Sequence, residues 1–178
     1  MRHPQPNIYG HSIVLLGNFN PKIFQPAWFG AEGLLGKEEI DKANIEIVHS
    51  DIAIFSVDWL RIEVVRDRFK VETTQEPYDE AVRDFVLGTF TLLRHTPIMK
   101  MGINRDMHFS IETVDKWHAV GHKLAPKELW EGILDKPGLL SLTMQGAKNK
   151  EDQKGYIRVL VEPSKSIHPG LFIEVNDH

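Results

Sequence analysis

A helical pattern followed at once by a long alternating strand, between Pro77 and Glu112, constrains the fold of this chain more than any other feature. Pro77 suits a first helical position, and Pro97 disfavours helical geometry at Thr96, so one helix is expected from Pro77 to His95. One face of this helix carries the apolar residues Tyr78, Ala81, Val82, Phe85, Val86, Leu92 and Leu93. Such spacing predicts that this face is buried.

The segment from Ile98 to Ile111 then switches to a period of two. One side of it carries Met99, Met101, Ile103, Met107, Phe109 and Ile111, whereas the other side is mainly polar. Alternation of this kind predicts a strand with one face in water, and hence an antiparallel or at most mixed sheet with helices on one side. We expect Met99, Met101, Ile103, Met107 and Phe109 to be buried against the preceding helix.

Arg105 interrupts this alternation, because its position places it among the apolar residues. A β-bulge could turn the side chain outward, or a buried carboxylate could pair with it. Alternatively, the apolar face could open there into a cleft in which the guanidinium binds an anion. The two structural interpretations together are preferred to the anion site, and we expect Arg105 to be substantially buried and paired.

The whole chain reads as one α+β domain, residues 1–178, with a curved antiparallel sheet and helices on one face. Residues 1–11 are interpreted as an N-terminal arm. Strands are predicted at 12–19, 45–49, 52–57, 59–65, 69–73, 98–111, 139–144, 156–162 and 171–175, and helices at 26–35, 37–43, 77–95, 114–124 and 126–134. Residues 146–155 form a polar loop. The order strand, helix, strands recurs, which indicates two half-repeats, 12–96 and 97–178.

Composition excludes several classes of protein. The 178 residues contain 21 Lys and Arg against 25 Asp and Glu, and the net charge of −4 does not suit general nucleic-acid binding. The absence of cysteine removes thiol catalysis and disulfides and favours a cytoplasmic location. The sequence has no apolar run of about 18 residues, so no membrane association is expected.

Two groups of residues are candidate sites. Asp115, His118 and His122 share one face of a predicted helix and could bind a divalent metal, although an ordinary polar face is the preferred interpretation and no cofactor is expected. Phe24, Trp28 and Phe29 belong to a dense aromatic segment. They form either a small core beneath a loop or a patch that binds a partner.

The stretch from Tyr78 to Arg105, with Met101-Gly102-Ile103-Asn104-Arg105 in its strand, resembles an uncharacterised, sporadically distributed bacterial protein family. Members of that family carry a Gly-x-x-Tyr-x-Asn-Arg-like strand after such a helix, and this chain lacks the aromatic residue. The resemblance implies a bacterial source. It assigns no activity and no catalytic residue.

The sequence therefore favours a non-enzymatic interaction or self-assembly domain, acting as a homodimer, another homo-oligomer or with another protein. An antiparallel sheet with edge strands and aromatic residues offers surface for such partners. The alternative is a small-ligand-binding domain or a metal-dependent enzyme that uses a sheet–helix cleft around Arg105.

Overall fold

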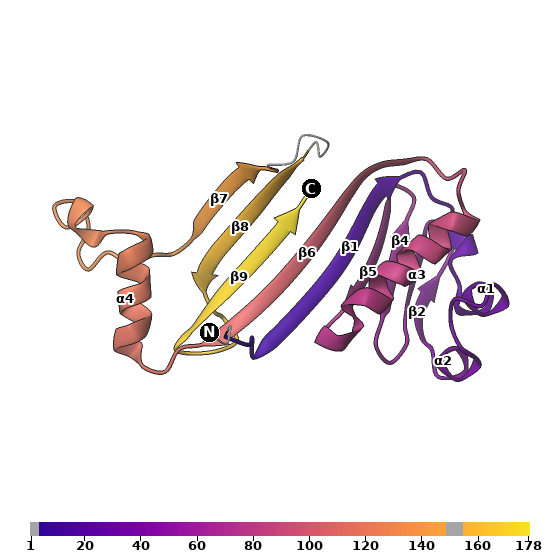
Figure 1. Cartoon of the computed structure of the whole chain (residues 1–178), viewed down its shortest axis with the longest axis horizontal. Coiled ribbons are helices and arrows are strands. Elements are labelled where there is room, and N and C mark those ends of the chain that lie inside the picture. Colours follow the sequence, from indigo (N-terminus) through magenta and orange to yellow (C-terminus); the bar gives the residue numbers. More distant parts are fainter. Residues whose placement is uncertain (1–3, 149–154) are drawn as a thin grey trace. The chain divides into compact units, whose positions relative to one another are not determined.

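The computed structural model describes residues 4–148 and 155–178, and the chain divides into two compact units. The N-terminal unit is built from residues 10–104, and the C-terminal unit from residues 105–177 together with the chain up to Tyr9. Within the described residues, nine strands pair in one open antiparallel sheet, accompanied by four α-helices (Figure 1). The predicted α+β class is therefore confirmed.

The N-terminal unit contains a strand, two short helices, a four-stranded meander and a longer helix. Its elements are β1 (Ile8–Gly17), the 3-10 turn η1 (Pro21–Ile23), α1 (Pro26–Ala31), α2 (Lys37–Asp41), β2 (Asn44–Val48), β3 (Ile52–Ser56), β4 (Arg61–Val65), β5 (Arg68–Thr73), the 3-10 turn η2 (Glu76–Tyr78) and α3 (Asp79–Leu92). The strand order is β2-β3-β4-β5-β1, followed by β6.

The C-terminal unit receives the second part of β6 and adds one helix and three strands. Its elements are β6 (Ile98–Ser110), α4 (Val114–Leu124), the 3-10 turn η3 (Lys127–Leu129), β7 (Leu142–Ala147), β8 (Tyr156–Pro163) and β9 (Gly170–Asp177). The strand order is β6-β9-β8-β7. The predicted loop at 146–155 starts too early, because Gly146 and Ala147 belong to β7, and residues 149–154 lie outside the described residues.

The two units have a similar order of elements. In both units a first strand is followed by helical segments and then by a meander, and the first strand pairs with the last strand of that meander: β1 with β5, and β6 with β9. The boundary between the units falls in the sequence between Asn104 and Arg105, within β6, and not at residues 96–97. One element has no counterpart among the described residues: a helix equivalent to α3 after β9.

The predicted N-terminal arm, residues 1–11, is shorter than expected. Strand β1 already begins at Ile8, and His11 pairs with Thr73 of β5. Asn7 is fixed as well, because its N–H donates to the His108 carbonyl at 2.7 Å and its side-chain oxygen accepts from the Ser110 N–H at 2.7 Å. Residues 8–11 of the expected arm are therefore part of the sheet, and Asn7 is bound to β6.

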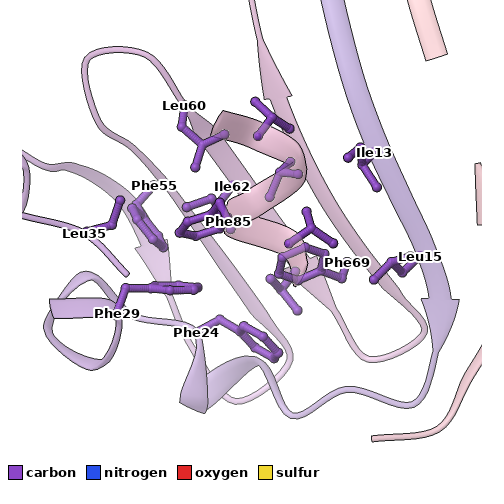
Figure 2. Packing of buried hydrophobic residues seen from close by; sticks show 14 of the residues in the cluster. Ile13, Leu15, Phe24, Phe29, Leu35, Phe55, Leu60, Ile62, Phe69 and Phe85 are labelled. Carbon is purple, nitrogen blue, oxygen red and sulfur yellow. The ribbon is translucent and has the colours of Figure 1, made fainter. Parts of the chain in front are cut away.

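All the buried residues of the main hydrophobic cluster belong to the N-terminal unit. Helix α3 contributes Val82, Phe85 and Val86, and the alternating strand β4 contributes Ile62 and Val64 (Figure 2). Aromatic rings fill the space between the helices and the sheet: the ring centroids of Phe29 and Phe85 lie 4.9 Å apart, and those of Phe24 and Phe69 lie 5.4 Å apart. The segment from Phe24 to Phe29 is therefore core.

The helix and strand at the centre of the sequence are present, although the α-helix spans only residues 79–92 and the strand ends at Ser110. The predicted burial of the strand is wrong in its first part. Met99 is 72% exposed and Met101 is exposed too, whereas Ile103 packs against the core and Met107 and Phe109 are half-buried. The reason lies in the strand order. Helix α3 packs on β5, and β1 separates β5 from β6.

The predicted helix at 126–134 is also wrong, because the structure has only the 3-10 turn η3 there. Leu129, Trp130 and Ile133 give the segment a helical apolar pattern, yet all three are exposed. Short helices gain most of their stability from packing of the apolar face. Without a surface to pack on, this pattern does not produce a helix.

A glycine at the start of β9 allows a close backbone approach inside the C-terminal unit. A Cβ on Gly170 would lie 2.7 Å from the Ile167 carbonyl oxygen and 2.9 Å from that of Phe109. We expect Gly170→Ala to lower the free energy of unfolding of this unit by about 1–3 kcal/mol, because backbone atoms cannot swing aside. Gly146→Ala is the matched control, since a Cβ there meets nothing within 4 Å. Urea unfolding, monitored by tryptophan fluorescence, measures the stability of both variants. Equal stability of the two would contradict the expected effect of Gly170→Ala.

Candidate interaction surface

One face of the C-terminal sheet is almost wholly apolar. Register places Leu142 opposite Val161 and Val161 opposite Ile173, and it likewise aligns Met144, Val159 and Val175. Directly opposed residues lie on the same face of a sheet. The large apolar residues of this face, which we call the apolar face, are Leu142, Met144, Ile157, Val159, Val161, Leu171, Ile173 and Val175, and Gly146, Pro163 and Asp177 lie at its edges.

Strand β6 extends the apolar face. Phe172 points to the opposite face of the sheet, because its neighbours in the strand, Leu171 and Ile173, point to the apolar face. The ring of His108 contacts that of Phe172 at 4.8 Å between centroids, so His108 also lies on the opposite face. Alternation then assigns Met107 and Phe109 to the apolar face. The opposite face is mixed, and on it Arg158 donates to the Gln145 side chain at 3.1 Å and stacks over the ring of Tyr156.

No helix or loop of the same unit covers this face in the described part of the chain. None of its ten side chains is buried, and Met144 is 64% exposed. In the N-terminal unit the corresponding side chains, such as Ile62, Val64 and Phe69, are fully buried beneath helices. Among the described residues of the C-terminal unit, only Gly170 is buried, so that unit lacks a hydrophobic core of its own.

The segment from Thr113 to Leu140, which we call the α4 arm, is a second exposed apolar surface of the same unit. Helix α4 lies beside the strands rather than across them (Figure 1). The large apolar residues exposed on the arm are Val114, Leu124, Leu129, Trp130, Ile133, Leu134 and Leu140. Exposed apolar patches of this size on a monomer usually mark interaction sites.

Hydrogen bonds fix the root of the α4 arm. The Ile111 N–H donates to the Pro169 carbonyl and the Trp117 indole N–H donates to the Gly170 carbonyl, both at 2.9 Å. The Thr113 hydroxyl caps α4 by accepting from the Lys116 N–H at 3.2 Å. Lys116 also pairs with Glu112 by a hydrogen bond that lowers the pKa of that carboxyl. The arm is therefore anchored at the start of β9.

A cavity of about 550 Å³ lies between α4, the rest of the arm and the adjoining ends of β8 and β9. Its lining includes Trp117, His118, Lys127, Glu131, Leu134 and Leu171. The charged groups among these residues are exposed or half-buried. A small-molecule site usually has a few polar groups converging on an enclosed space, and this lining lacks that arrangement.

Arg105 does not occupy the buried position that its place in the pattern predicts. The residue is exposed, and it does not line the cavity beside α4. In this part of β6 the apolar face has no covering element in the unit to bury a side chain, so a guanidinium there reaches solvent. Its predicted ligand-binding role gains no support from this position.

The predicted metal site has no metal-binding geometry. Asp115, His118 and His122 lie on α4 and all are exposed. His118 instead packs against the indole of Trp117, with 5.1 Å between ring centroids. Within residues 4–148 and 155–178, no three acidic or imidazole groups come close enough together to hold one ion.

Phe24, Trp28 and Phe29 do not form the interaction patch that was one of their two interpretations. Phe24 and Phe29 are fully buried, and the partly buried Trp28 packs against the same core. The other interpretation, a core beneath the loop, describes them correctly. Their density already favoured it, because adjacent large aromatics are more easily buried together than exposed.

Sequence reasoning missed the apolar face, although its signal is present. In three successive strands, apolar residues alternate with mainly polar ones, and Leu160 is the exception: Leu142 and Met144, then Ile157, Val159 and Val161, then Ile173 and Val175. Alternation identifies a common face but not whether anything covers it. The exposure appears only once the helices are located.

Comparison with models of known protein families and with curated proteins finds no match for this chain. None of the described helices has the length and apolar character needed to cross a membrane.

Proposed function

We propose that this protein is a non-enzymatic interaction domain that self-associates through the apolar face of its C-terminal unit. The observation that carries the proposal is the contrast between the two units. One buries its sheet beneath helices, whereas the other has an apolar sheet face on which none of the ten apolar side chains is buried.

The exposed area is large enough for a specific contact. Ten half-exposed apolar side chains present on the order of 500 Å² of apolar surface, against roughly 800 Å² per partner in a standard interface. Apolar side chains that remain in contact with water contribute little hydrophobic stabilisation to the unit. Association therefore both buries the face and completes a core for this unit.

The alternative function, a ligand-binding or metal-dependent site around Arg105, has weaker support. Arg105 is exposed, and the nearest candidate for a ligand cavity is lined by residues of the α4 arm instead. We therefore retain only the interaction role as the proposed function.

Sedimentation velocity over a range of protein concentrations tests this proposal. The expected result is a reversible shift from a species of 20.4 kDa toward one of twice that mass as the concentration rises. A single 20.4 kDa species at every concentration would contradict the proposal.

A further inference from the structure

The C-terminal unit has two apolar surfaces, the apolar face and the α4 arm. They adjoin at one end, where Leu134 of the arm and Leu171 of the face line the same cavity, but the arm does not bury the centre of the face. Each is of similar extent, because the seven large apolar residues of the arm also present on the order of 500 Å². Ile133 is 75% exposed, and Trp130 and Leu134 beside it are exposed as well. Surfaces of matching size and chemistry in one chain are suited to pack together.

The N-terminal unit shows how such a sheet is covered. There the helical segment that follows the first strand, α1 and α2, packs with α3 over the apolar side of the meander: Phe29 of α1 contacts Phe55 of β3 at 5.8 Å between ring centroids. The α4 arm occupies the same place in the order of elements, directly after β6. In its own unit, however, it lies beside the sheet (Figure 1).

The root of the arm explains why it does not cover its own face. Only residues 111–113 separate β6 from α4, and the hydrogen bonds of Ile111 and Trp117 hold this connection against the start of β9. The helix is thereby directed away from the strands it belongs to. Its apolar residues remain available to another sheet.

We propose that the α4 arm of one copy covers the apolar face of a second copy, and that the exchange is reciprocal. This inference rests on the proposed self-association and names its partner surface. A reciprocal exchange forms two identical contacts about a twofold axis and closes as a dimer. Two such contacts bury on the order of 2,000 Å² in total, which is within the range of stable dimers.

Cross-linking between cysteine variants tests the exchange directly, because the natural chain has no cysteine. One variant, Ile133→Cys, labels the arm, and a second, Val159→Cys, labels the centre of the apolar face. The two are unfolded together, refolded as a mixture and treated with a short bis-maleimide. Leu160→Cys is the matched control, since adjacent residues of a strand point to opposite faces.

The exchange predicts a covalent heterodimer of Ile133→Cys with Val159→Cys, in about tenfold higher yield than with Leu160→Cys, because docking raises the local concentration of the two thiols. Equal yields with Val159→Cys and Leu160→Cys would overturn it. So would an intrachain link in monomers of the double variant Ile133→Cys/Val159→Cys, which would show that the arm folds back on its own face.

Sedimentation of the natural chain separates the two proposals. If the chain dimerises but the arm and the face do not cross-link, the proposed self-association stands and the proposed exchange is wrong. If the chain is a monomer at all concentrations, both proposals are wrong. Filaments in place of a closed dimer would show head-to-tail contacts and would overturn the reciprocal arrangement.

Discussion

Replacement of Phe29 by alanine is expected to destabilise the N-terminal unit by about 3–5 kcal/mol, because truncation of a fully buried phenylalanine removes its apolar contacts and leaves a cavity. Phe29 is 0% exposed, and its ring meets those of Phe24, Phe55 and Phe85. These neighbours come from the sheet and from other helical segments, so no single element can relax to fill the space.

Leu87→Ala is the matched control for this variant. Leu87 lies on α3 but is 60% exposed, and its truncation should change the free energy of unfolding by less than about 0.5 kcal/mol. Urea unfolding monitored by near-ultraviolet circular dichroism measures both. Equal midpoints for the two variants would show that Phe29 does not hold the helices to the sheet. Phe29→Leu, with a smaller loss, extends the test if Phe29→Ala does not fold.

Replacement of Val159 by glutamate is expected to weaken self-association by about a hundredfold, because burial of a carboxylate without a partner costs about 3 kcal/mol or more. Val159 lies at the centre of the apolar face, between Met144 of β7 and Val175 of β9. Both of its cross-strand neighbours are apolar, so neither can act as a counterion for the new charge.

Leu160→Glu is the matched control, because it places the same charge one residue along the same strand but on the opposite face. There the residue opposite Leu160 on β7 is Thr143, and that on β9 is Glu174. Light scattering at a concentration where the natural chain is dimeric should show Val159→Glu as a monomer and Leu160→Glu as a dimer. Dissociation of both variants alike would point to damage to the strand instead of to the face.

Local pattern was sufficient to predict the central elements. The helix at 77–95 corresponds to η2 and α3, and the strand at 98–111 corresponds to β6, because proline positions and side-chain period depend on neighbours in the sequence. The recurring order of elements was also visible, although no repeat of residues accompanies it.

Burial was predicted less well, because it depends on which element lies over which strand. Met99 and Met101 alternate as buried residues do, yet α3 packs on β5 and leaves them exposed. The segment 126–134 has helical spacing, but no surface packs on its apolar residues. Arg105 is exposed because, in the described part of the chain, no helix of its unit covers the face on which it lies. The apolar face was missed because alternation in the sequence shows which residues share a face but not whether a helix covers that face.

Hydrogen exchange at several protein concentrations tests most directly whether the apolar face is uncovered in one copy and covered on association. We expect protection of residues 156–163 and 170–177 to rise with concentration, while that of residues 61–73 in the N-terminal unit stays constant. Protection of β8 and β9 that is high and independent of concentration would contradict the account, because those strands would then be stable without a partner.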